Sequence, residues 1–369
     1  MSMKEKCVEL LDMADIKISG SRPWDMQVHN EQLYQRLITA GSLGLGEGYM
    51  DGWWDAEQVD QLICNILSTD IESRIKPYKI LILSLRARVT NLQALKRAFQ
   101  VAEKHYDIGN RLFEIMLDRR MTYTCGYWRA ATDLDSAQED KLDLVCKKIN
   151  LQQGQHILDI GCGWGSFAKF AAENYGARVT GITVSKEQAE LAKENCKGLP
   201  VEIRVQDYRL VDEKFDHIIS LGMFEHVGNK NYRVYFEMAN KCLKDEGLFL
   251  LHTIGMLVSR STPNPWVHKY IFPNGQLPSM ALISRAVENL FVIEDVHNFG
   301  AYYDKTLMSW FENFDAGWDE IKKDYSERFY RMWKYYLLSC AGAFRARDIQ
   351  LWQLVLSKHG VPGGYERIT

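Results

Sequence analysis

Two different spacings of apolar residues alternate along the chain between residues 140 and 253. Apolar positions three or four apart predict helices, and short continuous apolar runs predict buried strands. Helices are expected at 140–149, 166–175, 186–197 and 232–243. Strands are expected at 156–160, 178–184, 201–205, 216–221 and 247–253. This alternation predicts an α/β, Rossmann-like domain with a mostly parallel sheet, whose ligands bind at the carboxyl ends of the strands.

The first 78 residues have an apolar periodicity of their own, which predicts a small, mainly helical N-terminal domain. Helices are expected at 7–14, 31–39 and 59–67, and a short strand at 16–18. The glycine-rich stretch from Gly41 to Gly48 is not followed by a Lys-Ser or Lys-Thr pair. We therefore interpret it as a structural turn and not as a phosphate-binding loop.

Basic and apolar side chains are interleaved between residues 74 and 104. We expect a connector at 79–98, between the N-terminal domain (1–78) and a larger domain at 99–369. A basic amphipathic connector binds anionic lipid, at about 1 kcal/mol for each basic residue near the surface. A solvated helix face that bridges two domains is the alternative, and the sequence leaves both open. The basic residues are Arg74, Lys76, Lys79, Arg86, Arg88, Lys96, Arg97 and Lys104.

Composition narrows the class of protein. The 369 residues are 46% hydrophobic and 25% charged, with a net charge of -3, which argues against a general nucleic-acid binder. The eight cysteines form no C-x-x-C pair, so the spacing gives no metal site. The first twenty residues do not resemble a secretory signal, and the longest apolar run, residues 80–83, is too short to span a bilayer. We expect a cytoplasmic protein.

The most informative segment runs from His156 to Gly165 and reads His-Ile-Leu-Asp-Ile-Gly-Cys-Gly-Trp-Gly. A buried strand ending near Asp159 leads into three alternate glycines, Gly161, Gly163 and Gly165, and then into a helix. Glycines let the backbone pass close beneath a ligand, and the start of the helix favours an anionic group. The segment therefore predicts a turn that binds a nucleotide-type cofactor.

The end of the second strand helps to choose the cofactor. NAD enzymes place an acidic residue there, whereas this strand ends in Thr183 and Ser185. The Asp-x-Gly-x-Gly turn resembles that of S-adenosylmethionine methyltransferases, in which the helix start meets the methionine carboxylate. The missing acid departs from their common pattern too, and Thr183 and Gln188 are candidates to replace its hydrogen bonds. After the third strand, Asp207 is a candidate acceptor for the adenine amine, flanked by Gln206 and Tyr208 as further candidate contacts. Cys162, inside the turn, completes the predicted cofactor-binding set.

Several further segments, spread over nearly the whole chain, resemble the cyclopropane-fatty-acyl-phospholipid synthase family in its full-length bacterial form. They are residues 103–110, 122–128, 222–228, 251–255, 270–275 and 340–345, together with the glycine-rich stretch and the Met-Asp-Gly-Trp-Trp segment near the N-terminus. The resemblance makes 99–369 the catalytic domain. It gives the N-terminal domain a role in lipid capture, dimerisation or both.

The resemblance implies that a methylene group from S-adenosylmethionine is added across the cis double bond of an unsaturated phospholipid acyl chain. An alkene is a poor nucleophile, so the site must align it with the donor and exclude water. Attack leaves a carbocation, which aromatic faces can stabilise, and a base must then remove a proton. A homodimer acting at the inner face of the cytoplasmic membrane is the expected assembly.

The resemblance also implies the base, a bound bicarbonate ion. The residues that carry over are Cys125, Glu225, His252, Tyr303 and the backbone of Ile254. Glu225 would accept a hydrogen bond from the bicarbonate hydroxyl, while His252 and Tyr303 would donate to its oxygens. Tyr123 and Thr124 are expected to cover the cofactor.

Some assignments stay open at this stage. Tyr302 is the neighbour of Tyr303 and a rival for its role, and Cys340 is the rival of Cys125, although its apolar helix favours packing. Two other functions remain possible. One is a methyltransferase of small molecules or proteins in which Glu225 or His252 acts as general base. The other is a non-catalytic protein that binds lipid or senses the cofactor.

Overall fold

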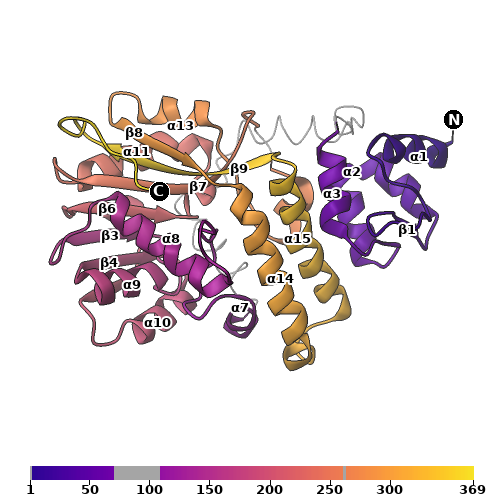
Figure 1. Cartoon of the computed structure of the whole chain (residues 1–369), viewed down its shortest axis with the longest axis horizontal. Coiled ribbons are helices and arrows are strands. Elements are labelled where there is room, and N and C mark those ends of the chain that lie inside the picture. The colour runs from indigo at the N-terminus through magenta and orange to yellow at the C-terminus, as the bar shows by residue number, and fades with distance from the viewer. Residues whose placement is uncertain (1, 70–108, 261–262) are drawn as a thin grey trace. The chain divides into compact units, whose positions relative to one another are not determined.

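The computed structural model describes residues 2–69, 109–260 and 263–369, and these form two compact units (Figure 1). The described part of the first unit comprises 2–69, 260, 263–273 and 303–349. The second comprises 109–259, 274–302 and 350–369. The units are thus discontinuous in sequence, unlike the three consecutive segments expected. The predicted connector, 79–98, and the motif residues 103–108 lie outside the described residues.

The second unit is built on a seven-stranded sheet with the order β5-β4-β3-β6-β7-β9-β8. The five strands from β3 to β7 pair in parallel, and β8 and β9 pair antiparallel with each other. This confirms the predicted mostly parallel α/β sheet. The strands are β3 (His156–Ile160), β4 (Arg178–Thr183), β5 (Val201–Val205), β6 (His217–Leu221), β7 (Leu248–Met256), β8 (Val292–Asn298) and β9 (Ile349–Ser357).

Four helices of this unit, α8 to α11, lie where the apolar periodicity predicts them, whereas α7 and α13 were not predicted. The helices are α7 (Asn110–Met116), α8 (Leu134–Lys148), α9 (Ser166–Tyr175), α10 (Lys186–Asn195), α11 (Tyr232–Cys242) and α13 (Met280–Val287), with short 3-10 turns η1 (Tyr208–Leu210), η2 (Phe224–His226) and η3 (Asn229–Asn231). Only α8 differs much from its predicted range, beginning six residues earlier than 140. The Asp133 side chain accepts a hydrogen bond from the Ser136 backbone and caps the helix there.

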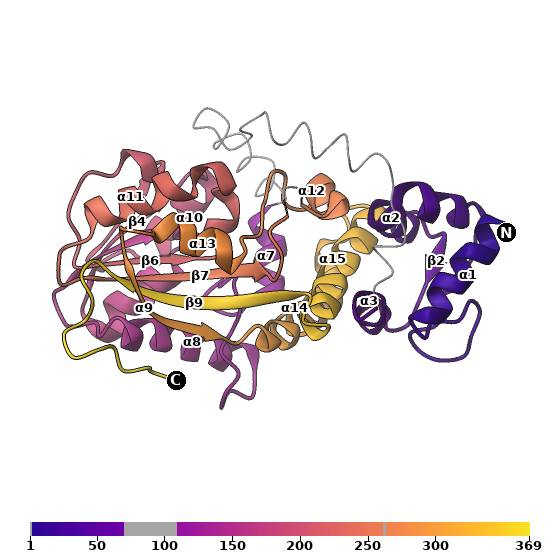
Figure 2. The same cartoon turned by 90° about the horizontal axis from the view of Figure 1, so that it is seen from above.

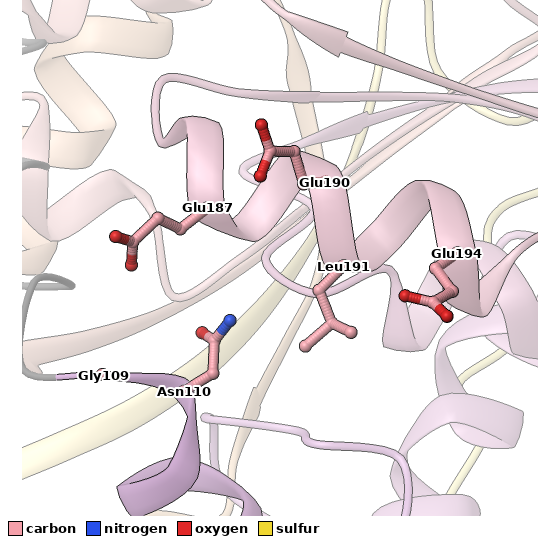
Figure 3. A pocket seen from close by; sticks show the side chains of 6 residues that line it. All are labelled: Gly109, Asn110, Glu187, Glu190, Leu191 and Glu194. Atoms are coloured by element: carbon pink, nitrogen blue, oxygen red, sulfur yellow. The ribbon is translucent and has the colours of Figure 1, made fainter.

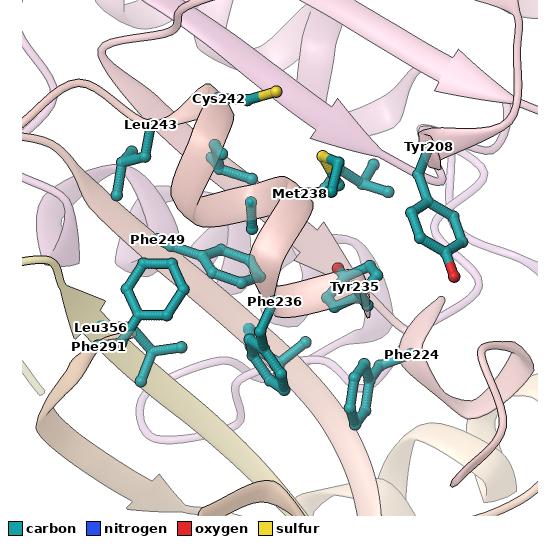
Figure 4. Close-up of a cluster of buried hydrophobic side chains, with 14 of the residues drawn as sticks. Tyr208, Phe224, Tyr235, Phe236, Met238, Cys242, Leu243, Phe249, Phe291 and Leu356 are labelled. Atoms are coloured by element: carbon teal, nitrogen blue, oxygen red, sulfur yellow. The ribbon is translucent and has the colours of Figure 1, made fainter. Parts of the chain in front are cut away.

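Alternate residues of the central strands are buried on opposite faces of the sheet, as the pleat requires. Leu158 and Ile160 join the core that the sheet forms with α11 and α13, a cluster rich in aromatic rings (Figure 4). Ile157 joins the core formed with α8 and α9 on the other face (Figure 2). Both faces are covered, which explains why these strands read as continuous apolar runs.

The order of the strands places the site. The chain moves outward from β3 to β4 and β5, then returns to the other side of β3 to form β6 and β7. A crevice at the carboxyl ends of the strands is expected where the order reverses, between β3 and β6. Asp159, at the end of β3, and Glu225, just after β6, both belong to this edge.

The first unit is mainly helical, as predicted. It contains α1 (Met3–Met13), α2 (Gln32–Met50), α3 (Val59–Leu67), α12 (Pro265–Tyr270), α15 (Glu327–Arg345), most of α14 (Ala301–Ile321) and a small sheet of β1 (Gln27–Val28) and β2 (Trp54–Asp55). Arg345 of α15 forms ion pairs with Asp60 of α3, at 2.6 Å, and Asp304 of α14, at 3.0 Å. Across the described ranges, no helix is both long and apolar enough to cross a membrane.

The predicted turn at Gly41–Gly48 is wrong. Helix α2 runs through this stretch and is interrupted only at Gly41, where φ is 54° and ψ is -129°. The glycines allow close packing: a Cβ on Gly46 would lie 2.4 Å from the Trp266 ring, and one on Gly48 would lie 2.7 Å from Leu33. Glycine composition alone does not distinguish such a packing surface from a turn.

Candidate active site

The glycine turn after β3 has the backbone shape expected of a ligand cradle. The φ angles of Gly161, Gly163 and Gly165 are 82°, 54° and 85°, which side chains rarely adopt. A Cβ on Gly163 would have no atom within 4 Å, so the backbone there borders open space. Helix α9 starts directly afterwards, at Ser166, and its free N–H groups suit a carboxylate.

Asp159 supplies an acidic group beside this turn. It is 2% exposed, and its Oδ2 atom has no hydrogen-bond partner among the described residues. Burial raises the pKa of Asp159 to about 7, although the charge of Lys141 opposes the shift. A buried acceptor without a partner is costly, and a ligand with donor groups would satisfy it.

Cys162 does not face a ligand with its side chain. It packs with Ala189, Ala192 and Ile203 in a small core beneath the turn, and burial raises the pKa of its thiol far above the usual range. A contact between Cys162 and a cofactor would therefore involve its backbone.

The structure brings together Thr183 and Gln188, the proposed replacements for the missing acid. The Thr183 hydroxyl donates to Gln188 Oε1 at 3.0 Å, and Ser185 caps α10 by accepting from the Gln188 backbone at 3.3 Å. The Gln206 backbone donates to the Thr183 carbonyl at 3.0 Å. These side chains thus form one polar group at the carboxyl ends of β4 and β5.

Asp207 and Tyr208 lie next to this polar group but are engaged elsewhere. Both carboxylate oxygens of Asp207 accept hydrogen bonds from the Arg209 guanidinium, at 2.8 and 2.7 Å. The Tyr208 ring packs in the core, 5.2 Å from the Tyr235 ring. Their predicted contacts with the cofactor are not tested by these interactions.

The segment 122–128 lies against the glycine turn and the end of β6. Tyr123 packs edge-to-face with Phe113, at 5.3 Å between ring centroids, and Phe113 contacts Trp164 of the glycine turn at 4.9 Å. Thr124 lies over Gly222: a Cβ on that glycine would be 2.7 Å from the Thr124 methyl. Both predicted covering residues therefore border the crevice between β3 and β6.

Glu225 stands at the carboxyl end of β6 in the turn η2. Its Oε1 atom accepts a hydrogen bond of 2.6 Å from the Ile254 backbone N–H. Its Oε2 atom is buried without a hydrogen-bond partner in the described part of the chain. Burial raises the pKa of Glu225 to about 7. The backbone N–H of Ile254, expected to hold bicarbonate, thus holds Glu225 in this structure.

His252 lies on the neighbouring strand β7, in register with Leu221 at the end of β6. The Gln353 amide nitrogen faces its Nδ1 atom at 3.2 Å. An amide nitrogen donates, so Nδ1 accepts and Nε2 carries the proton. Nε2 is buried and unpartnered within the described ranges. Burial lowers the pKa of His252 well below its usual value, so the imidazole is neutral.

Cys125 and Tyr302 belong to the same unit as Glu225 and His252. Cys125 is fully buried, and its thiol donates to the Gly126 carbonyl at 3.2 Å. The Tyr302 ring packs on that of Tyr127 at 5.5 Å. The ring of Phe299 lies between Tyr302 and His252, about 6 Å from each.

Tyr303 and Cys340 belong to the other unit. The Tyr303 ring stacks on that of Phe344 at 4.5 Å. Cys340 lies on α15, and burial raises the pKa of its thiol to about 12, which disfavours a nucleophile. Their predicted relation to Glu225 is not tested here and stays a prediction.

A cavity of about 470 Å³ lies between the start of α7 and one face of α10 (Figure 3). It is lined by Gly109, Asn110, Glu187, Glu190, Leu191 and Glu194. None of the predicted site residues lines it. It adjoins the glycine turn only through Asn110, which accepts a hydrogen bond from the Trp164 indole at 3.0 Å.

Three residues that sequence reasoning missed support the site. Gln353 fixes His252, while Gln138 and Lys141 of α8 bond to Thr124 at 2.7 and 2.8 Å. Gln138 and Lys141 are fully buried. The sequence indicates them only weakly, because they are two polar residues with the spacing of the apolar face of a helix.

Comparisons with known proteins agree with this geometry. A family model described as mycolic acid cyclopropane synthetase matches residues 93–354. The Escherichia coli (strain K12) protein named cyclopropane-fatty-acyl-phospholipid synthase is 52% identical over 357 residues, which cover 96% of this chain and 93% of that one.

Two solved structures are similar to this chain in fold as well as in sequence. The cyclopropane synthase MmaA2 from Mycobacterium tuberculosis is 30% identical, with a TM-score of 0.67 over 70% of this chain and 98% of its own. The mycolic acid cyclopropane synthase CmaA1, complexed with SAH and CTAB, is 32% identical, with a TM-score of 0.66 over 70% and 98%. The chain belongs to the mycolic acid cyclopropane synthetase family and has the fold of S-adenosylmethionine-dependent methyltransferases.

Proposed function

We propose that the chain transfers a methylene group from S-adenosylmethionine to the cis double bond of unsaturated phospholipid acyl chains, with bound bicarbonate as the base. The name of the E. coli relative supports the phospholipid substrate, because the two chains are similar over almost their entire lengths. The SAH complex of CmaA1 supports the cofactor.

The residues at the carboxyl ends of β3 and β4 fit the cofactor. The glycine turn and the start of α9 present N–H groups for its carboxylate, and the unpartnered Oδ2 of Asp159 accepts from its ammonium group. Thr183 and Gln188 offer polar atoms near the end of β4 for the ribose. When bound, S-adenosylmethionine supplies an electrophilic methyl group and bicarbonate supplies a base small enough to fit beside a lipid chain.

The residues after β6 and on β7 fit a bicarbonate ion. Neutral His252 would donate from Nε2 to an anion oxygen, and Glu225, once ionised, would accept the bicarbonate hydroxyl at Oε2. Cys125 adds a polar thiol from the segment over the end of β6. A further donor, Tyr303, is suggested by the family resemblance alone. These side chains would hold and orient the anion, and bicarbonate would supply the base.

One observation carries the proposal: Glu225 Oε2 and His252 Nε2, an acceptor and a donor, are both buried and without hydrogen-bond partners within the described chain, Glu225 just after β6 and His252 on the neighbouring β7. Each costs about 1–3 kcal/mol if it stays unsatisfied, and one hydrogen-carbonate ion satisfies both.

Product analysis tests the proposal. The protein is incubated with S-adenosylmethionine and vesicles of mono-unsaturated phospholipid, first in carbonate-free buffer and then with bicarbonate added back. We expect lipids that gain one CH2 while losing the alkene, at a rate that bicarbonate restores. Methylation of a heteroatom with the alkene intact would refute the reaction. A rate indifferent to bicarbonate would refute the base.

We also propose that the protein works as a homodimer bound peripherally to the inner face of the cytoplasmic membrane. The interleaved basic and apolar residues of 74–104 support attachment to anionic lipid. Sedimentation of the protein with and without anionic vesicles measures both the assembly and the attachment. A monomer that stays in the supernatant at low salt would contradict both.

A further inference from the structure

The ammonium of Lys141, which bonds to Thr124, is fully buried, and burial lowers its pKa to about 8. Lys141 lies in the middle of α8, on the face that packs against the sheet, and none of its surface is exposed. Burying a charge is expensive unless other groups compensate for it. A lysine kept in such a place therefore calls for a partner charge or a function.

Contacts lead from Lys141 to the predicted bicarbonate residues. Its Nζ atom donates to the Thr124 hydroxyl at 2.8 Å, and Cys125 is the next residue of that segment. The Thr124 methyl covers Gly222, whose N–H donates to the His252 carbonyl at 2.9 Å. The ammonium is thus one side chain away from the strand ends that carry Glu225 and His252.

Several acidic groups lie close enough to Lys141 to interact with the positive charge of its ammonium. Asp118, Asp159 and Cys125 all act on it electrostatically, and its own charge helps to lower the pKa of His252. Asp118 accepts hydrogen bonds from the Thr122 and Arg120 backbones and from the Thr122 hydroxyl. Burial raises the pKa of Asp118, Asp159 and Glu225. Each of them that ionises repels a further anion, so binding of that anion needs positive charge nearby.

We propose that Lys141 is a positioning residue for the anionic base: its ammonium supplies buried positive charge that makes bicarbonate binding favourable while holding Thr124 in place. This rests on the proposed function and adds a residue that neither the sequence motifs nor the relatives' names assign. Lys141 is fully buried and bonds to Thr124, so we expect its effect to fall on the affinity for bicarbonate and less on the rate at saturation.

Gln138 provides a matched control. It lies one turn before Lys141 on α8, is equally buried, and anchors the same segment by donating to the carbonyls of Thr124 at 2.7 Å and Thr122 at 3.3 Å. Gln138→Met removes an anchor and keeps the ammonium, whereas Lys141→Met removes an anchor together with the charge.

The experiment measures turnover of unsaturated phospholipid vesicles against added bicarbonate, for the wild type, Lys141→Met and Gln138→Met, after thermal melting has shown that each is folded. We expect Lys141→Met to raise the half-saturating bicarbonate concentration by roughly tenfold or more, the scale on which one nearby opposite charge shifts an ionisation. Gln138→Met should change it by less than about threefold, as for loss of one neutral hydrogen bond. Should Lys141→Met fail to fold, Lys141→Gln, which keeps a donor for Thr124, carries the same expectation.

Three results would overturn or redirect the inference. Equal shifts in the lysine and glutamine variants would mean that Lys141 only anchors the segment. An unchanged half-saturating concentration in folded Lys141→Met would mean that its charge does not act on the anion. A wild type without saturable dependence on bicarbonate would instead contradict the proposed base itself, so the two failures are distinguishable.

Discussion

At the scale of single residues, the site depends on buried polar atoms that the fold leaves without partners. The Oε1 atom of Glu225 accepts from the Ile254 N–H, while its Oε2 atom is buried without a hydrogen-bond partner in the described part of the chain. His252 is likewise fixed at Nδ1 and open at Nε2. Half-satisfied side chains are preorganised by the protein while remaining able to bind a ligand.

Replacing Glu225 by glutamine should separate binding from chemistry. Glu225→Gln keeps the shape of the side chain but places an amide where the anion's hydroxyl would donate, so turnover should fall by about a hundredfold or more. Binding of S-adenosylmethionine, measured by calorimetry, should change little, because the glycine turn lies on β3. Glu194→Gln, on the exposed face of α10, is the matched control and should keep full turnover. Parallel loss of cofactor binding and turnover in Glu225→Gln would contradict the assigned role.

The same carboxyl predicts a pH dependence of stability. The folded pKa of Glu225, about 7, lies above its ordinary value of 4.5 because of burial. Folding is therefore favoured by the proton below pH 4.5, and this contribution is lost as the pH rises through about 7. At about 1.36 kcal/mol for each pKa unit, ionisation costs the ligand-free protein about 3 kcal/mol.

Glu225→Gln has no such ionisation, so the free energy of unfolding of the variant relative to the wild type should rise between pH 5 and pH 8. Urea unfolding at both pH values measures this difference. A relative stability that stays constant across the range would contradict the buried, ionisable state of Glu225.

At the scale of secondary-structure elements, the turn between β3 and α9 is the segment on which we propose that cofactor binding depends. Gly161 and Gly154 have the same φ of 82°, but a Cβ on Gly161 would lie 2.7 Å from Met223, whereas one on Gly154 would have no atom within 4 Å. Gly154→Ala should therefore cost only the backbone strain, about 1–2 kcal/mol. Gly161→Ala should lose more stability and weaken S-adenosylmethionine binding as well. Thermal melting with and without the cofactor compares the two variants, and equal effects would argue against the cradle.

Local patterns predicted most elements of the catalytic sheet. The strands at 156–160 and 201–205 and the helix at 166–175 coincide with β3, β5 and α9, since each is bounded by turn residues and buried along a regular face. Asp159 was correctly placed near the end of β3 and Glu225 just after β6. His252 was expected near the end of its strand but lies in the middle of β7, which continues to Met256. Prediction from the sequence is most accurate where the spacing of the apolar residues matches the face of the helix or strand that is buried.

What the sequence could not predict arises from contacts between distant segments. The Ile254–Glu225 bond joins residues 29 positions apart, and the Gln353–His252 contact joins residues 101 positions apart. The glycines of α2 were misread as a turn because close packing explains them. Gly46, for example, leaves room for the ring of Trp266, which is remote in sequence. No local period records such tertiary contacts.

At the scale of the whole molecule, the chain combines a methyltransferase sheet with a mainly helical unit assembled from separate stretches. The proposed substrate resides in a bilayer, so attachment to the membrane is a property of the full chain. Lys96 and Arg97 belong to the connector, outside the described residues, and their contribution follows from the sequence alone.

Charge reversal at these two positions, Lys96→Glu with Arg97→Glu, should weaken attachment to anionic vesicles, because each basic residue near the surface contributes about 1 kcal/mol. Vesicle sedimentation at low salt measures the loss. Turnover of detergent-dispersed lipid should be affected much less than turnover of vesicles. Equal activity of the double variant on both substrates would favour a bridging segment with no role at the membrane.

The central claim is that an alkene carbon takes the methyl group of the cofactor and that a base then removes one of its protons. The most direct measurement uses S-adenosylmethionine with a trideuterated methyl group and mono-unsaturated phospholipid vesicles, followed by mass spectrometry of the acyl chains. We predict a cyclopropane product that retains two of the three deuterium atoms, the third having gone to the base. A product that retains all three, as a simple methylated chain or headgroup would, contradicts the account.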